Sequence, residues 1–302
     1  MKSILKQLFN NLYQLIPGKK YLFLLIKMFY KPPLKIAHKL YFGGSFPVNY
    51  NGYSFRMNGF NKRGFSRENL LFWYGLGKGA NWERQSVDLW IEMVKYSEVV
   101  LDIGANTGFY SLLAKSVNPN IKVIGFEPVA HVYNYYSSNC KLNKYDIDIH
   151  NIAISNKTGY SQIFSEKTEK NVYSASLDEK FAKDHSTKEI LAFQIKTVTL
   201  FDFIKQEKLS KVDLIKIDVE GFEAEVLVGM GEYLRNFAPT MLIEILTDEL
   251  GAEVQSILDD VGYLYFKLNK GPRPELVQKI IASDDYNYFI CKVEVAKQLK
   301  LL

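Results

Sequence analysis

The stretch Leu101-Asp102-Ile103-Gly104-Ala105-Asn106-Thr107-Gly108-Phe109 decides the fold of this 302-residue chain. It completes a short apolar run, residues 99–103, which predicts a buried strand, and it leads into residues 109–117, whose pattern predicts a helix. Gly104 and Gly108 permit a tight turn in which a ligand can approach the backbone. Their spacing is GxxxG, which matches neither the GxGxxG fingerprint of dinucleotide-binding folds nor the GK[ST] of triphosphate loops.

Strands and helices alternate around this turn. The expected strands are residues 99–103, 121–126, 147–154, 212–217 and 240–245, with a closing hairpin of 263–268 and 286–292. The expected helices are residues 82–96, 109–117, 129–142, 222–230 and 254–261, and an inserted region contains two more strands, 160–164 and 193–198. Buried parallel strands separated by helices predict an α/β fold, a doubly wound and mostly parallel sheet of seven strands. Such sheets bind ligands beyond the carboxyl ends of their strands.

Residues at the ends of the first two strands favour an adenosyl cofactor. Asp102 would face the ammonium group of an amino-acid tail, and the loop amides would face its carboxylate. The predicted loop contacts are Gly104, Ala105, Asn106, Thr107 and Gly108. Glu127 ends the second strand, where an acidic side chain can accept hydrogen bonds from both ribose hydroxyls, and Pro128 restricts the backbone before the next helix. The order of these residues predicts S-adenosylmethionine; two ordinary strand–helix turns are the alternative.

A third motif carries a resemblance to a known family. Residues 213–230, which read DLIKIDVEGFEAEVLVGM, are similar to the DxxKxDxEGxE signature of the FkbM family of class I methyltransferases. Asn151-Ile-Ala153-Ile-Ser resembles the third-strand motif of that family, and Leu242-Ile-Glu244 its fifth-strand acid. Two departures are Phe201 within the family's T-L-D motif and Leu246 where a histidine is frequent.

The resemblance covers about residues 85–292. It implies a Rossmann-like class I methyltransferase fold that binds S-adenosylmethionine and transfers a methyl group to a hydroxyl, typically of a sugar or a secondary metabolite. It also adds Asn151, Ala153 and Asp218 to the predicted cofactor-binding residues.

The acidic end of the strand 212–217 carries the predicted chemistry. Lys216 and Asp218 project to one face of this strand, and a lysine inside an apolar strand is costly to bury unless it is paired, with Asp218, Glu220 or Glu223 as natural partners. We assign Asp218 as the general base or hydroxyl acceptor, Glu220 as the group that holds the acceptor, and Lys216 as the group that orients Asp218. Two alternatives stay open: an ion-pair network that fixes the turn, and a divalent metal bound by Asp218, Glu220 and Glu244. Our assignment includes no metal.

Residues 1–84 form a predicted extension to the domain 85–302. Twelve Lys or Arg and no Asp or Glu lie between positions 1 and 67, whereas the remaining chain has 26 basic and 33 acidic residues. Apolar spacing over residues 4–16 predicts an amphipathic helix, and Asn51-Gly52 predicts a hairpin turn. The run 21–30 is too short to span a bilayer. A basic extension of this kind can lie on a membrane, pack on its own domain or form a homodimer.

These features together predict a cytoplasmic enzyme, peripheral at the inner membrane face, whose acceptor is a sugar or glycan, free or lipid-linked. Cys140 and Cys291 are expected to be reduced thiols. RNA methylation through the basic extension is the second enzymatic reading. The acidic turn would repel phosphates, and no NPP[YF] motif is present, so nucleic acid is not the expected partner. A non-enzymatic cofactor-binding scaffold is the third reading.

Overall fold

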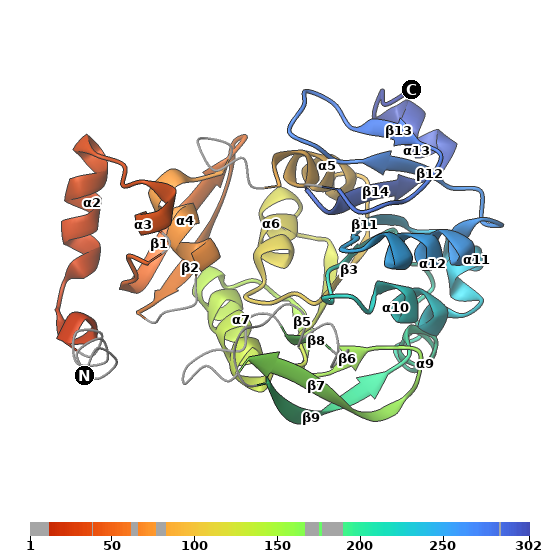
Figure 1. The fold of residues 1–302 in the computed structure, drawn as a ribbon, viewed down its shortest axis with the longest axis horizontal. Helices are drawn as coiled ribbons and strands as arrows, with labels where there is room; N and C mark the ends of the chain where they lie inside the picture. Colours follow the sequence, from red (N-terminus) through yellow and green to blue (C-terminus); the bar gives the residue numbers. More distant parts are fainter. Residues whose placement is uncertain are drawn as a thin grey trace. The chain divides into compact units, whose positions relative to one another are not determined.

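The structure, a computed structural model, describes residues 12–37, 39–61, 66–76, 83–166, 175–176, 190–283 and 285–302. The described residues up to position 76 form one compact unit, the N-terminal unit, and those from position 83 on form another, the C-terminal unit. Figure 1 draws the first in red and orange and the second in yellow through blue.

The N-terminal unit is a hairpin with helices packed on it. Its elements are α2 (Lys19–Phe29), α3 (Leu34–Ala37), β1 (Gly43–Tyr50), β2 (Tyr53–Phe60) and α4 (Ser66–Tyr74). The predicted turn at Asn51 and Gly52 is confirmed, since Tyr50 pairs with Tyr53 and both turn residues have positive φ, as a two-residue hairpin turn requires. The predicted helix 4–16 falls largely on residues 1–11, which lie outside the described residues.

Aromatic side chains fill the core of the N-terminal unit. Phe42, just before β1, and Phe46 of β1 pack against Phe72 of α4. Phe72 also packs against Trp73, and all four side chains are buried. Their burial assigns these side chains to the core of the unit.

In the described C-terminal unit the main sheet has eight strands in the order β13-β12-β14-β11-β10-β3-β4-β5. Their bounds are β3 (Val99–Ile103), β4 (Lys122–Phe126), β5 (Asp148–His150), β10 (Leu214–Ile217), β11 (Thr240–Glu244), β12 (Leu264–Lys267), β13 (Glu275–Val277) and β14 (Asn287–Cys291). From β5 to β11 neighbouring strands are parallel, and β14 is antiparallel to both β11 and β12. The predicted doubly wound α/β fold is therefore confirmed. The expected count of seven strands missed β13, a three-residue edge strand on β12.

Helices cover both faces of this sheet. They are α5 (Arg84–Val94), α6 (Phe109–Val117), α7 (Ala130–Asn143), α9 (Leu200–Gln206), α10 (Glu223–Met230), α11 (Tyr233–Phe237), α12 (Asp248–Leu258) and α13 (Val293–Gln298). One apolar core joins one face of the central strands to α9, α10, α11 and α12. The helices α5, α6 and α7 contact one another in sequence, and α6 also contacts β4 (Figure 1).

Two predicted elements differ from the structure. The expected strand 147–154 is broken into β5 and β6 (Ala153–Ile154), because the Asn151 side chain donates hydrogen bonds to the carbonyls of Glu127 and Pro128 and turns the chain out of the main sheet. The helix α12 begins at Asp248 and not at position 254, since Thr247 caps it by accepting a hydrogen bond from the Leu250 amide.

A second sheet has the order β6-β9-β7-β8. Its further strands are β7 (Gly159–Glu166), β8 (Ala175–Ser176) and β9 (Ile190–Val198), and β7 and β9 pair antiparallel. The two strands predicted in the inserted region are confirmed.

Candidate functional site

The loop that follows β3 is tied to the end of β4. The amides of Gly104 and Ala105 both donate to the Phe126 carbonyl, at 3.0 and 2.9 Å. Gly104 has a φ of +78°, and a Cβ at this position would lie 1.9 Å from the Asp218 carbonyl oxygen. Only glycine fits both conditions, so the backbone of the predicted cofactor loop lies directly against the predicted catalytic turn.

A tyrosine from α7 supports the other end of the loop. A Cβ at Gly108 would lie 2.1 Å from the Tyr136 ring, and one at Gly125 would lie 2.1 Å from the Tyr136 hydroxyl. That hydroxyl donates to the Ser111 hydroxyl at 2.5 Å, which in turn donates to the Asp102 carboxylate at 2.6 Å. Sequence reasoning missed Tyr136 and Ser111, although a glycine inside the apolar strand β4 signals the close approach of a neighbouring group.

Asp102 is buried within this network. One of its oxygens accepts from both the amide and the hydroxyl of Ser111. Burial raises the pKa of its carboxyl to about 6, against the lowering effect of the Ser111 hydrogen bonds and the Lys216 charge. The carboxylate therefore fixes the first turn of α6 through Ser111. The contact of Asp102 with the ammonium group of a ligand stays a prediction.

Glu127 links three segments at the end of β4. Its two carboxylate oxygens accept from the amides of Asn106, at 3.0 Å, and of Val129, at 2.8 Å. Asn151 donates to the carbonyls of Glu127 and Pro128, so four of the predicted cofactor residues lie together. Burial raises the pKa of the Glu127 carboxyl to about 7, although its two amide hydrogen bonds act in the opposite direction.

Two other predicted cofactor residues face the protein interior. The Thr107 carbonyl accepts from the buried Asn139 side chain at 2.9 Å. Ala153 packs with Ile163 and Ile195 in a small apolar cluster at the second sheet. Ala153 is therefore part of a hydrophobic cluster. Its contact with a cofactor remains a prediction.

Lys216 is buried in the middle of the main sheet. Its strand places it in register between Asp102 of β3 and Leu242 of β11. Its Nζ lies 3.3 Å from an Asp218 carboxylate oxygen and 5.6 Å from the centroid of the Tyr110 ring. A lysine with 1% of its surface exposed needs such partners, because an unpaired buried charge is strongly unfavourable. This ion pair can hold the Asp218 carboxylate in one orientation.

The turn after β10 is closed by Glu223 at the start of α10. Its carboxylate accepts from the amides of Val219, at 3.0 Å, and Gly221, at 3.1 Å. Of the three carboxylates expected as partners of Lys216, Asp218 forms an ion pair with it, while the Glu223 carboxylate accepts hydrogen bonds from the backbone of the turn. Burial raises the pKa of the Glu223 carboxyl to about 8. Glu220, at the tip, has a φ of +56°, a left-handed conformation that is uncommon outside glycine.

Glu244 adds a further carboxyl at the end of β11. Burial, with repulsion from Asp218 as the next cause, raises the pKa of this carboxyl well above its usual range. Within the described ranges, no group of three or more His, Cys, Asp or Glu is arranged to hold a metal ion.

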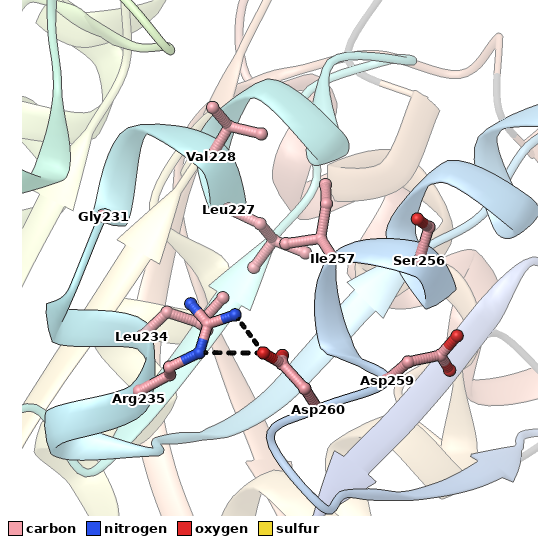
Figure 2. A pocket seen from close by; sticks show the side chains of 9 residues that line it. All are labelled: Leu227, Val228, Gly231, Leu234, Arg235, Ser256, Ile257, Asp259 and Asp260. Atoms are coloured by element: carbon pink, nitrogen blue, oxygen red, sulfur yellow. Dashed lines mark hydrogen bonds and ion pairs between the residues drawn. The ribbon is translucent and has the colours of Figure 1, made fainter.

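A separate depression of about 300 Å³ lies among α10, α11 and α12 (Figure 2). Arg235 and Asp260 line it and form an ion pair of 2.5 Å between exposed side chains. None of the predicted site residues belongs to its lining, so the candidate site stays at the strand ends.

Comparisons with known proteins agree with this geometry. The sequence profile of the Methyltransferase FkbM domain family matches residues 102–265, more than half of the chain. The chain is 24% identical over 180 residues to Methyltransferase 1 of Beauveria bassiana, a match that covers 54% of this chain and 71% of that protein. It is 25% identical over 189 residues to Methyltransferase sdnD of Sordaria araneosa, with 54% and 73% covered.

Solved structures with a similar fold include the methyltransferase FkbM from Methylobacillus flagellatus, with 18% identity and a TM-score of 0.37 over 64% of this chain and 43% of that chain. An S-adenosylmethionine-dependent methyltransferase from Agrobacterium tumefaciens has 12% identity and a TM-score of 0.42 over 82% and 70%. The residues matched by the family profile include the loop after β3, the acid at the end of β4 and the acidic turn after β10. The chain therefore belongs to the FkbM methyltransferase domain family, and it is a methyltransferase with S-adenosylmethionine as its cofactor.

Proposed function

We propose that this methyltransferase transfers a methyl group to a hydroxyl of a sugar, glycan or related small-molecule acceptor. The observation that carries the proposal is the ion pair of Lys216 and Asp218 at the edge of the cofactor loop. The Asp218 amide donates to the Ile103 carbonyl at 3.0 Å, and its carbonyl lies against Gly104. A carboxylate is therefore held next to the cofactor loop, where an acceptor hydroxyl would need a proton acceptor.

The residues around the loop fit the cofactor by their donors and acceptors. The Glu127 carboxylate offers acceptors for ribose hydroxyls. The amides of Gly104, Ala105, Asn106 and Gly108 already donate to oxygens of the protein, so the amino-acid tail would lie against the backbone of the loop rather than on these amides. We assign the ribose contact to Glu127 and the tail contacts to Asp102 and residues 104–108. When bound, S-adenosylmethionine supplies an electrophilic methyl group on a sulfonium sulfur.

The chain's own residues would then act on the acceptor. Asp218 accepts the hydroxyl proton as the acceptor oxygen attacks the methyl group. The ion pair with Lys216 keeps the Asp218 carboxylate oriented. Glu220, at the tip of the turn, holds a second hydroxyl of the acceptor. Positioning of the hydroxyl would supply most of the rate, and the general base about 10²–10⁴-fold.

Incubation with methyl-labelled cofactor and a fractionated cell extract tests this proposal. The fractions are free sugars, glycolipids, polysaccharide, RNA and protein, and the labelled product is identified by mass spectrometry. We expect the label on an oxygen in a sugar-containing fraction. Label in RNA, with an RNA affinity that falls steeply with salt, would overturn the proposal in favour of RNA methylation. Cofactor binding by calorimetry without turnover in any fraction would favour a cofactor-binding scaffold.

A further inference from the structure

The helix α2 presents large apolar side chains on its exposed face. Tyr21, Leu22, Leu25, Met28 and Phe29 recur at spacings of three and four residues, which place them along one side of a helix. All five are exposed, Met28 and Phe29 to 74% and 82%. Surface helices of globular proteins ordinarily turn their polar side outward, so this face is the reverse of the usual arrangement.

Two of the three lysines of α2 turn inward instead. Lys19 is 5% exposed, and its Nζ donates to the Tyr13 carbonyl at 2.7 Å. Lys27 donates to the Phe72 carbonyl, and Phe23 packs on Trp73 with ring centroids 5.2 Å apart. The orientation of the helix is therefore set by specific contacts, and the apolar face is held outward by them.

Residues on either side of α2 extend the apolar surface. The further exposed apolar side chains are Leu12, Leu15, Ile16, Tyr30, Leu34 and Ile36. Contiguous exposed apolar side chains on a folded protein typically mark a surface that contacts another molecule or a membrane. Among the described residues, no helix is long and apolar enough to cross a membrane.

The charge of the segment selects the partner. The first 67 residues contain twelve basic and no acidic residues, and Lys31, Lys35 and Lys39 are exposed close to α2. A second copy that met this face by two-fold symmetry would bring together two segments that lack any acid, and their like charges would repel. We propose that α2 and its flanking residues dock on an anionic phospholipid surface, with the apolar face in the interface and the lysines over the headgroups.

Vesicle binding by the full chain tests this proposal. We expect cosedimentation with phosphatidylcholine vesicles that contain about a third phosphatidylglycerol, weaker binding to phosphatidylcholine alone, and a loss of binding with salt. The double variant Leu25→Glu and Met28→Glu should weaken binding at least about tenfold. Both side chains are exposed, so the variant should unfold at the same temperature as the natural chain. The matched control, Tyr160→Glu with Val228→Glu, alters exposed apolar side chains of the C-terminal unit and should bind normally.

A charge pair of variants tests the lysines separately. Lys31→Glu with Lys35→Glu should abolish the preference for anionic vesicles, whereas Lys297→Glu with Lys300→Glu, exposed in the C-terminal unit, should retain it. Absence of vesicle binding, or equal binding by the Leu25→Glu and Met28→Glu variant, would overturn the proposal. A dimer in sedimentation velocity that this variant converts to a monomer, without vesicle binding, would assign the face to a second copy.

Discussion

Four carboxyl groups lie near adjoining strand ends of the C-terminal unit: those of Asp102, Glu127, Asp218 and Glu223. The hydrogen bonds and ion pairs of each group indicate a different role. Glu127 and Glu223 each accept two hydrogen bonds from backbone amides, which makes them supports of the loop and of the turn. Asp102 accepts from Ser111. Asp218 differs from these three because its carboxylate forms an ion pair with the buried ammonium of Lys216. The ion pair orients this carboxylate, as the proposed role of general base requires.

Replacement of this carboxylate gives the first prediction. Asp218→Asn should lower the rate of methyl transfer by about 10²-fold or more, while the cofactor dissociation constant from calorimetry changes little. The matched control is Asp259→Asn, an exposed residue near the depression of Figure 2, which should leave both quantities unchanged. Turnover by Asp218→Asn at the natural rate would contradict the assignment of Asp218 as the base.

At the scale of elements, the two turns after β3 and β10 form one structure. The Gly104 backbone and the Asp218 carbonyl are in contact, and the Asp218 amide is bonded to the end of β3. The elements around these turns were predictable, since α6 and the core of β10 follow directly from apolar periodicity. The break between β5 and β6 was not, because it depends on hydrogen bonds from Asn151 to residues more than twenty positions away.

A glycine pair tests this contact. Gly104→Ala should lower the free energy of unfolding by about 4 kcal/mol or more and weaken cofactor binding, because the new Cβ would meet a backbone oxygen. Gly262→Ala is the control: its φ of +77° is nearly the same, yet its nearest neighbour is a lysine Nζ at 3.6 Å. Gly262→Ala should lower the free energy of unfolding, measured by urea unfolding, by about 1–2 kcal/mol, because alanine is strained in a left-handed conformation. Equal losses for the two variants would show that the contact has no effect.

At the scale of the whole molecule, the C-terminal unit contains several buried acids whose pKa values are raised in the folded state. Burial raises the pKa of Glu127 to about 7 and that of Glu223 to about 8, from an ordinary value of 4.5. The folded chain therefore binds these protons more tightly than the unfolded chain does. The free energy of unfolding contributed by such groups falls as the pH rises from 4.5 through the folded pKa values.

We expect the cofactor-free protein to lose stability as the pH rises between about 4.5 and 8, and Glu223→Gln to reduce that loss. The measurement is urea unfolding over this pH range, with the exposed Glu249→Gln as the control. The stability of Glu223→Gln relative to the natural chain should increase with pH, since the variant has no carboxyl to ionise. A difference between the two chains that is constant with pH would contradict a raised pKa at Glu223.

The amino-acid sequence by itself determined the α/β class, the turn after β3, the acid Glu127 at the end of β4 and the motif around Asp218, because each depends on local periodicity or on a short run of residues. Only the tertiary structure decided that Tyr136 and Ser111 support the loop, that Glu223 closes the turn, and that α2 turns its apolar face outward. These features depend on contacts between residues far apart in the chain. Hydrophobic periodicity shows that a helix has an apolar side, but the packing of Lys19 and Lys27 against the N-terminal unit determines which way that side points.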